Sequence, residues 1–287
     1  MTTTTSTTVY SGAFNFAFVG FDQTQIDAGN ITAHQTANSN ENQNVTLTLE
    51  GHTEFFALDH DRIDNSNRGD YHIRAGGATN DFVRGVFIAS VAQNGVDHGF
   101  GDGTEYGSAT IGIRGDNSVF VSVDNSLGRE YNPNVSAANF DFTRYIGAWV
   151  RDNGHQVTTG GEGASKIHTS RNSDGSYTIK IDGVNSNEDG ILLVTGAENR
   201  AQYGAARPLA DGSGWVLDVH DNVLDGMDNT GYEFGFTYLP KGDVATTFGR
   251  VLSDGSSDIP TAPTRSTRSA SANTSCSSTA RRRQTAP

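Results

Sequence analysis

The sequence predicts an all-β fold, a β-sandwich of the jelly-roll or lectin-like kind. Glycine occurs 34 times in 287 residues, charged residues make up only 18%, and Asn, Asp, Ser and Thr are abundant. This composition is poor in helix formers and favours many short strands joined by tight turns. Short or alternating apolar runs recur between Gly, Asn and Asp residues, and no segment sustains a 3.6-residue period.

The predicted strands are the clearest of these apolar runs. They lie at 45–49, 54–58, 71–74, 82–91, 109–114, 118–123, 140–150, 176–181, 190–195, 214–219, 232–239 and 247–252. Turn signals separate them, among them Asp-Gly at 182–183 and 211–212 and Ser-Asp-Gly at 173–175 and 253–255. Asp-Gly between apolar runs supplies the positive φ that two-residue hairpin turns need.

An internal repeat relates the two halves of this series. Segments 85–94, 106–109, 120–125 and 139–143 match 190–199, 203–206, 215–222 and 233–237 in the same order. We therefore predict a duplicated strand set, with pseudo-repeats at about 84–147 and 189–240, which is too few copies for a solenoid. We expect one sandwich in which the related strand sets face each other. Two small sandwiches side by side, or chance similarity between hairpins, are the alternatives.

The organisation along the chain is predicted to be simple. Residues 1–9 form a flexible Thr-rich N-terminus, 10–252 the sandwich domain, and 253–287 a disordered Ser/Thr/Arg tail with too few apolar residues to offset its ordering entropy. The single cysteine, Cys276, lies in that tail and excludes an internal disulfide or a cysteine metal cluster. The start lacks the basic and apolar regions of a signal peptide, and no apolar run reaches the roughly 18 residues that span a bilayer.

The charge distribution bears on possible partners. The net charge is −13, but the tail carries five arginines and no acid, so without them the rest of the chain stands at −18. An acidic body repels phosphate backbones, so no nucleic-acid partner is expected. A solvated acidic surface and a surface that binds cations are the two interpretations of this charge.

Two acidic clusters are candidate metal ligands. The residues are Asp59, Asp61, Asp64, Asp221, Asp225 and Asp228. Ca²⁺ takes six to eight oxygen ligands, which Asp- and Asn-rich loops provide, although neither run fits an EF-hand. The alternative is that these residues bond their own backbone and stabilise turns. No cofactor is otherwise required.

No catalytic motif is present, so we do not expect an enzyme. The chain lacks a nucleophile elbow, a phosphate-binding loop and a His-Glu-x-x-His zinc motif. Arg-Gly-Asp occurs at 68–70 and 114–116, and the second copy sits where a hairpin turn is expected. Exposed aromatic rings would stack on sugars, but Trp149 and Trp215 lie in apolar runs and are expected in the core.

Several strings resemble a poorly characterised β-sandwich module of large secreted or surface-exposed bacterial proteins. They include Gly-Val-Phe-Ile-Ala-Ser-Val-Ala-Gln-Asn-Gly at 85–95 and Tyr-Glu-Phe-Gly-Phe-Thr-Tyr-Leu-Pro at 232–240, within a span of about 82–252. The resemblance implies no catalytic residues. Phage tail and fibre proteins, which need no signal peptide, are an alternative source of such strings.

These observations together predict a non-catalytic structural or adhesive module at a cell surface, in the extracellular space or on a virion. Its partners would be further copies of itself or neighbouring surface or virion proteins. The second hypothesis is a carbohydrate-binding domain, assisted by Ca²⁺, and the third is a glycan-cleaving enzyme of the tailspike type.

Overall fold

The computed structural model describes the strand-forming core of the chain and its ordered turns. The described residues are 14–19, 26–35, 45–51, 59–60, 71–73, 84–92, 107–113, 119–125, 134–160, 163–197, 202–221, 233–243, 245–252, 254 and 256–258. Apart from one 3-10 turn, η2 (Ala164–Lys166), their regular structure is all strand, so the all-β prediction is confirmed. The strands are β1 (Phe14–Val19), β2 (Asp27–Gln35), β3 (Val45–Gly51), β4 (Asp59–His60), β5 (Tyr71–Ile73), β6 (Gly85–Ala92), β7 (Gly107–Ile113), β8 (Val119–Asn125), β9 (Asn134–Asp141), β10 (Ile146–Val150), β11 (Gln156–Gly160), β12 (Ile167–Arg171), β13 (Tyr177–Ile181), β14 (Gly190–Ala197), β15 (Gln202–Pro208), β16 (Trp215–Asp221), β17 (Glu233–Pro240), β18 (Thr246–Val251) and β19 (Ser257–Asp258).

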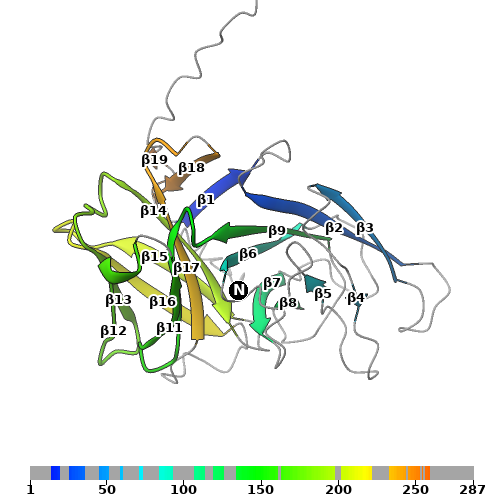
Figure 1. Cartoon of the computed structure of the whole chain (residues 1–287), viewed down its shortest axis with the longest axis horizontal. Coiled ribbons are helices and arrows are strands. Elements are labelled where there is room, and N and C mark those ends of the chain that lie inside the picture. The colour runs from blue at the N-terminus through cyan, green and yellow to red at the C-terminus, as the bar shows by residue number, and fades with distance from the viewer. Residues whose placement is uncertain are drawn as a thin grey trace, which may run out of the picture.

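The strands form four sheets (Figure 1). The largest has the order β11-β10-β17-β14-β7-β8-β5-β4. Two four-stranded sheets have the orders β12-β13-β16-β15 and β3-β2-β9-β6, and a small sheet has the order β1-β18-β19. Among the described strands every pair is antiparallel except β14 and β7, which meet in parallel at Ala197 and Ile111.

Strands β10, β14 and β17 form a middle layer that is buried on both faces. On one face of β17, Phe234, Phe236 and Tyr238 pack with β13 and β16. On the opposite face, Leu239 packs with Ile191 of β14 and with residues of β2, β9 and β18. Burial on both faces explains why these strands have near-continuous apolar sequences rather than an alternating pattern.

Aromatic side chains fill the two cores. The rings of Tyr177 and Phe234 meet edge to face with centroids 4.7 Å apart. Trp215 is 1% exposed and Trp149 is 2% exposed, so the prediction that both tryptophans are core residues is confirmed. Neither ring is available to stack on a sugar.

The strands of the two predicted repeats pair in the same pattern. Hairpin β7–β8 lies between β6 and β9 in the chain, and β6 pairs with β9; hairpin β15–β16 lies between β14 and β17 in the same way. The registers differ, however, because Val86 lies opposite Phe140 whereas the matching Ile191 lies opposite Leu239, not Phe234. The duplication itself stays a prediction.

One predicted strand and several omissions need correction. The run 140–150 is not one strand, because β9 ends at Asp141 and β10 begins at Ile146. Asp141 makes the turn between them: its Oδ1 accepts from the Thr143 N–H at 2.6 Å and its carbonyl from the Tyr145 N–H at 2.9 Å. Strands β1, β2, β4, β11, β12, β15 and β19 were not among the predicted runs.

Turns with Asp-Gly follow the prediction, since Gly183 and Gly212 have φ of 77° and 71°. The predicted tail contains β19, which pairs with β18 through Val251 and Ser257. Run 54–58, residues 1–9 and residues 259–287 lie outside the described residues.

Candidate functional site

Strand β1 exposes a row of aromatic rings at the edge of its sheet. Phe14, Phe16 and Phe18 alternate with Asn15, Ala17 and Val19, so the two sets lie on opposite faces. Ala17 and Val19 pack on the core that includes Phe248 of β18. The rings point the other way, and Phe14 and Phe18 are 55% and 68% exposed.

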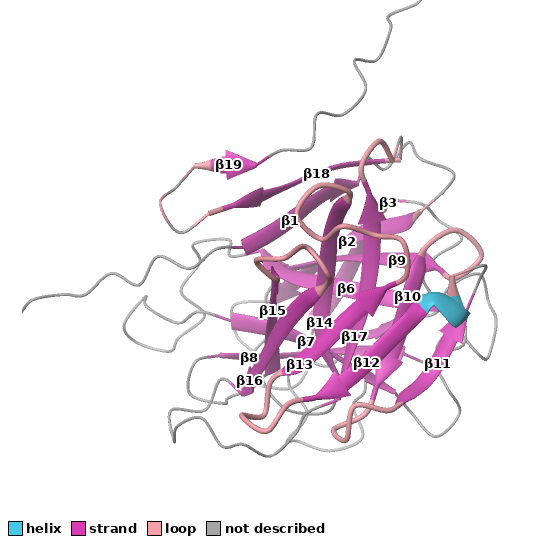
Figure 2. Ribbon diagram, turned by 90° about the vertical axis from the view of Figure 1, so that its left-hand side faces the viewer, coloured by secondary structure: helices cyan, strands magenta, loops and turns pink. Residues whose placement is uncertain are grey.

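This small sheet concentrates the exposed apolar surface of the described residues. Their exposed large hydrophobic side chains are Phe14, Phe18 and Leu252. Val251 of β18 lies opposite Phe14 in the β1–β18 register and shares its face, whereas Leu252, the next residue, alternates to the other face. Figure 2 shows β1, β18 and β19 side by side. The outer face of the sheet is therefore an apolar patch.

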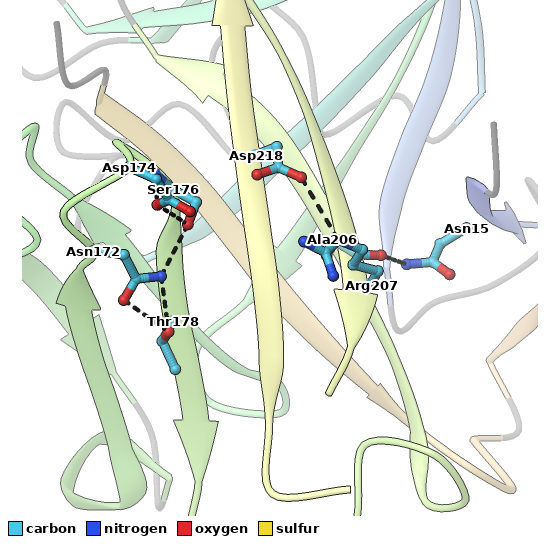
Figure 3. Close-up of polar contacts among 8 residues, drawn as sticks. All are labelled: Asn15, Asn172, Asp174, Ser176, Thr178, Ala206, Arg207 and Asp218. Atoms are coloured by element: carbon cyan, nitrogen blue, oxygen red, sulfur yellow. Dashed lines mark hydrogen bonds and ion pairs between the residues drawn. The ribbon is translucent and has the colours of Figure 1, made fainter. Parts of the chain in front are cut away.

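Asn15 ties β1 to the rest of the molecule through its side chain. Its Nδ2 donates to the carbonyl of Leu192 in β14 at 2.9 Å and to the carbonyl of Ala206 in β15 at 3.2 Å. Figure 3 shows this amide reaching Ala206, beside the ion pair of Arg207 and Asp218. The Oδ1 atom of Asn15 is buried and has no hydrogen-bond partner among the residues that the structure describes. Asn15 thus links β1 to β14 and β15, in addition to the pairing of β1 with β18.

A groove of about 720 Å³ runs along β1. Its other walls come from residues 28–30 of β2, 88–90 of β6, 136–138 of β9, 192–194 of β14 and 204–206 of β15. The lining is mainly apolar, with Asn15, Asn30, Ser90 and Ser136 as its polar side chains. It contains no titratable side chain among the described residues.

The other described edge strands are short, charged, irregular or covered. β4 and β19 have only two residues each, and β11 meets a register shift at Trp149 and Val150. β3, β12 and β15 carry Glu50, Arg171 and Arg207, and β6 lies against β7, β10 and β14. These are the features that protect sheet edges from pairing with other chains. β1 has six consecutive pairs with β18 and no charged residue or proline, and like β6 it lies against other strands of this chain, β14 and β15.

The predicted metal ligands are not brought together in the part of the chain that the structure describes. Asp59 lies in β4 of the eight-stranded sheet and Asp221 ends β16 in a four-stranded sheet. Asp61, Asp64, Asp225 and Asp228 lie outside the described residues. Within the described ranges, no three His, Cys, Asp or Glu side chains cluster as metal ligands would. The Ca²⁺ site stays a prediction, and thermal unfolding with Ca²⁺ and with a chelator would test it.

Other aspartates do form turns by bonding their own backbone. Ser176 donates to Asp174 Oδ1 through its hydroxyl at 2.6 Å and through its N–H at 3.1 Å, as Figure 3 shows beside Asn172 and Thr178. These bonds lower the pKa of the Asp174 carboxyl, and Ser256 does the same for Asp254. Turn-making is therefore the observed role of these described aspartates.

The remaining candidates add little to the site. Both Arg-Gly-Asp segments lie outside the described residues. Among the helices that the structure describes, none is long and apolar enough to cross a membrane.

The exposed rings of β1 were missed in the interpretation of the sequence, although a signal was present. Phenylalanine at 14, 16 and 18 repeats with the period of two that characterises a strand. Alternation shows which side chains share a face, but an outward apolar face looks the same in sequence as a core-facing one. Only the packing of Ala17 and Val19 on the core reveals which face is exposed.

The chain was also compared with known proteins. No family model, curated protein or solved structure matches it. The resemblance to surface modules of bacterial proteins therefore stays a prediction.

Proposed function

We propose that this chain is a non-catalytic structural or adhesive module of an extracellular or virion assembly, and that the β1–β18 sheet is its assembly surface. The observation that carries the proposal is the exposure of Phe14 and Phe18 on β1, the edge strand of its sheet. Exposed apolar patches of this kind mark interaction surfaces.

The chemistry of the groove supports binding rather than catalysis. General acid–base catalysis needs a titratable side chain close to the substrate, and the described lining offers amides, hydroxyls and apolar groups. The carbohydrate-binding alternative has less support, because Trp149 and Trp215 are buried and their rings cannot stack on a sugar.

The finer architecture and the location belong to the same proposal. A jelly-roll or lectin-like sandwich with a duplicated strand set is supported by the nesting of β7–β8 between β6 and β9 and of β15–β16 between β14 and β17. A location at a surface or on a virion is supported by the acidic, Gly- and Asn-rich composition.

Sedimentation velocity over a wide concentration range tests the proposal. We expect the wild-type chain to associate as concentration rises and Phe14→Ser/Phe18→Ser to remain monomeric, because serine removes the exposed rings without entering the core. Lys180→Ser, an exposed change on β13, is the control and should associate like the wild type. Near-ultraviolet circular dichroism checks that the double variant is folded. A wild type that stays monomeric throughout, or a double variant that associates equally well, contradicts the proposal.

A further inference from the structure

We propose that the groove along β1 binds an uncharged amphiphile, a molecule with an alkyl chain and a hydroxylated head. The inference goes beyond the proposed function and does not rest on it, because the walls of the groove come from strands of a single copy of the chain. Three properties of the groove support it, namely the order of the side chains along its floor, its size and its lack of charge.

The sheet that contains β2, β9 and β6 forms the floor of the groove, and one end of this floor is apolar. Ala138 of β9 lies opposite Ile88 of β6 on one side and opposite Ala28 of β2 on the other. Phe140, two residues further along β9, shares the same face and is 1% exposed. All four residues line the groove and belong to one apolar core or pack against it. This end of the floor therefore offers a largely buried apolar surface to an alkyl chain.

The other end of the floor carries hydroxyl and amide groups. Ser136, two residues before Ala138, lies opposite Ser90 of β6 and Asn30 of β2 on the same face. The Ser136 hydroxyl donates to Asn30 Oδ1 at 2.6 Å, which holds the amide across the two strands. Ser90 is exposed, and Asn30 and Ser136 are half-buried, so this end of the groove reaches solvent. A hydroxylated head at this open end meets both hydrogen-bond donors and acceptors.

The facing walls leave room for a ligand of ordinary size. β14 contributes residues 192–194, which are leucine and valine, and β15 contributes residues 204–206, which are glycine and alanine. These small side chains of β15 fill little of the space between the strands. The resulting volume is about 720 Å³, within the roughly 300–1,000 Å³ of sites that bind small molecules in proteins.

The absence of charge in the lining selects the class of ligand. Among the described residues, no titratable side chain lines the groove. An ionised group that enters an apolar site without a partner loses its hydration at a large cost in free energy. The net charge of −13 adds a general repulsion against anions. An uncharged head is therefore preferred over both a carboxylate and a quaternary ammonium head.

Competition binding to the full chain tests this class of ligand. Nile red, an uncharged dye whose fluorescence rises in apolar surroundings, is bound first and is then displaced by octanol, nonanol or decanol. We expect the affinity of the alcohols to rise about fourfold for each added methylene group that is buried. Decanoate, which is ionised at pH 8, and decyltrimethylammonium have the same chain length and are expected to bind at least tenfold more weakly than decanol.

Variants of the floor test the position of the ligand. Ala138→Leu fills the apolar end and is expected to weaken the binding of Nile red and decanol tenfold or more. Ala210→Leu, the same change at an exposed turn outside the groove, is the matched control and should bind like the wild type. Ser90→Ala removes a hydroxyl at the open end and should weaken decanol about fivefold, the effect of one neutral hydrogen bond. Near-ultraviolet circular dichroism checks that each variant is folded.

Each outcome decides one part of the inference. Saturable binding of Nile red that decanol reverses and Ala138→Leu abolishes supports it. Decanoate or decyltrimethylammonium binding as tightly as decanol overturns the uncharged class, and a folded Ala138→Leu that binds like the wild type overturns the site. If Ala138→Leu does not fold, an unchanged decanol affinity in Ser90→Ala overturns the position of the head. A chain that binds none of these molecules overturns the inference as a whole, while self-association measured by sedimentation still tests the proposed function separately.

Discussion

The indole ring of Trp149 in β10 lies over Gly235 in β17. The two residues are opposite each other in the antiparallel register, and a Cβ atom built on Gly235 would lie 2.7 Å from Cζ3 of the ring. The same indole donates its Nε1–H to the carbonyl of Gly85 in β6 at 3.0 Å. Trp149 therefore links two neighbouring strands of the middle sheet and ties that sheet to the one beside it.

The closeness of this contact predicts that Gly235→Ala is destabilising. The added methyl group would overlap the six-membered part of the indole, and overpacking of a close-packed core costs about 1–3 kcal/mol. Urea denaturation of the wild type and the variant measures the change in the free energy of unfolding. Smaller rings should relieve the overlap, so Trp149→Phe/Gly235→Ala is expected to be more stable than the sum of the two single changes. If the changes in unfolding free energy of the two single variants add to that of the double variant within about 0.5 kcal/mol, overlap with the indole ring is not the cause of the destabilisation.

Sequence patterns predicted the strands of this region but not this contact. Phe234, Gly235 and Phe236 lie in a run that was correctly predicted as a strand. Placing Gly235 opposite Trp149 requires the register between strands more than 80 residues apart, and local periodicity carries no information about it. For the same reason the stacking of sheets on both faces of β17 was not predicted from its near-continuous apolar sequence.

The residues of the candidate site were not predicted from the sequence, for a different reason. The acidic clusters were predicted from chemistry that needs only neighbouring residues, and most of them fall outside the described residues. Phe14 and Phe18 carry no chemical motif, and their importance depends on exposure on an edge strand. Exposure and edge position follow from the sheet order, which short-range patterns do not specify.

The hydrogen bonds of Asn15 predict an unusual response to charge at this position. Asn15→Ala removes two bonds to main-chain carbonyls, and at about 1 kcal/mol each it should lower the free energy of unfolding by about 1–2 kcal/mol. Asn15→Asp should be worse at pH 7, because a carboxylate cannot donate to the carbonyls of Leu192 and Ala206 and repels them.

The pH dependence of the Asn15→Asp variant separates this explanation from a general loss of packing. Facing two carbonyls raises the pKa of the aspartic acid in the folded state above its unfolded value of about 3.9. The penalty is therefore present at neutral pH and is relieved as pH falls, when the protonated acid can donate again. Free energies of unfolding of Asn15→Asp and Asn15→Ala should converge between pH 7 and pH 4. A constant difference across that range would contradict the donor role of Asn15.

An unsatisfied hydroxyl in the middle sheet predicts a stabilising substitution. Thr237 in β17 is fully buried, and within the described part of the chain its Oγ1 has no hydrogen-bond partner. Thr237→Val replaces that hydroxyl by a methyl group of similar size and should raise the free energy of unfolding by about 1 kcal/mol. Thr195→Val in the neighbouring strand β14 is the matched control, because the Thr195 hydroxyl donates to the Gly196 carbonyl at 3.3 Å. We expect no gain from the control, and equal effects at both sites would contradict the assignment.

Tyr238 predicts a loss of stability at alkaline pH. Burial, together with the nearby charge of Asp189, raises the pKa of its phenol from about 10 to about 12. The hydroxyl donates to the Asp189 carbonyl at 2.7 Å, a bond that the phenolate cannot make. Because the folded pKa is the higher one, the contribution of Tyr238 is complete below pH 10 and is lost as pH rises towards 12.

The comparison with Tyr238→Phe isolates this residue from other titrating groups. Burial and the charge of Asp243 also raise the pKa of Tyr145, so the wild type loses stability from more than one tyrosine. Tyr238→Phe lacks the hydrogen bond and should be less stable at pH 7 by about 1 kcal/mol. Having no phenol to ionise, the variant should lose less stability than the wild type between pH 10 and pH 12. The two unfolding curves must therefore approach each other as pH rises, and parallel curves would show that Tyr238 titrates no differently in the folded and unfolded chains.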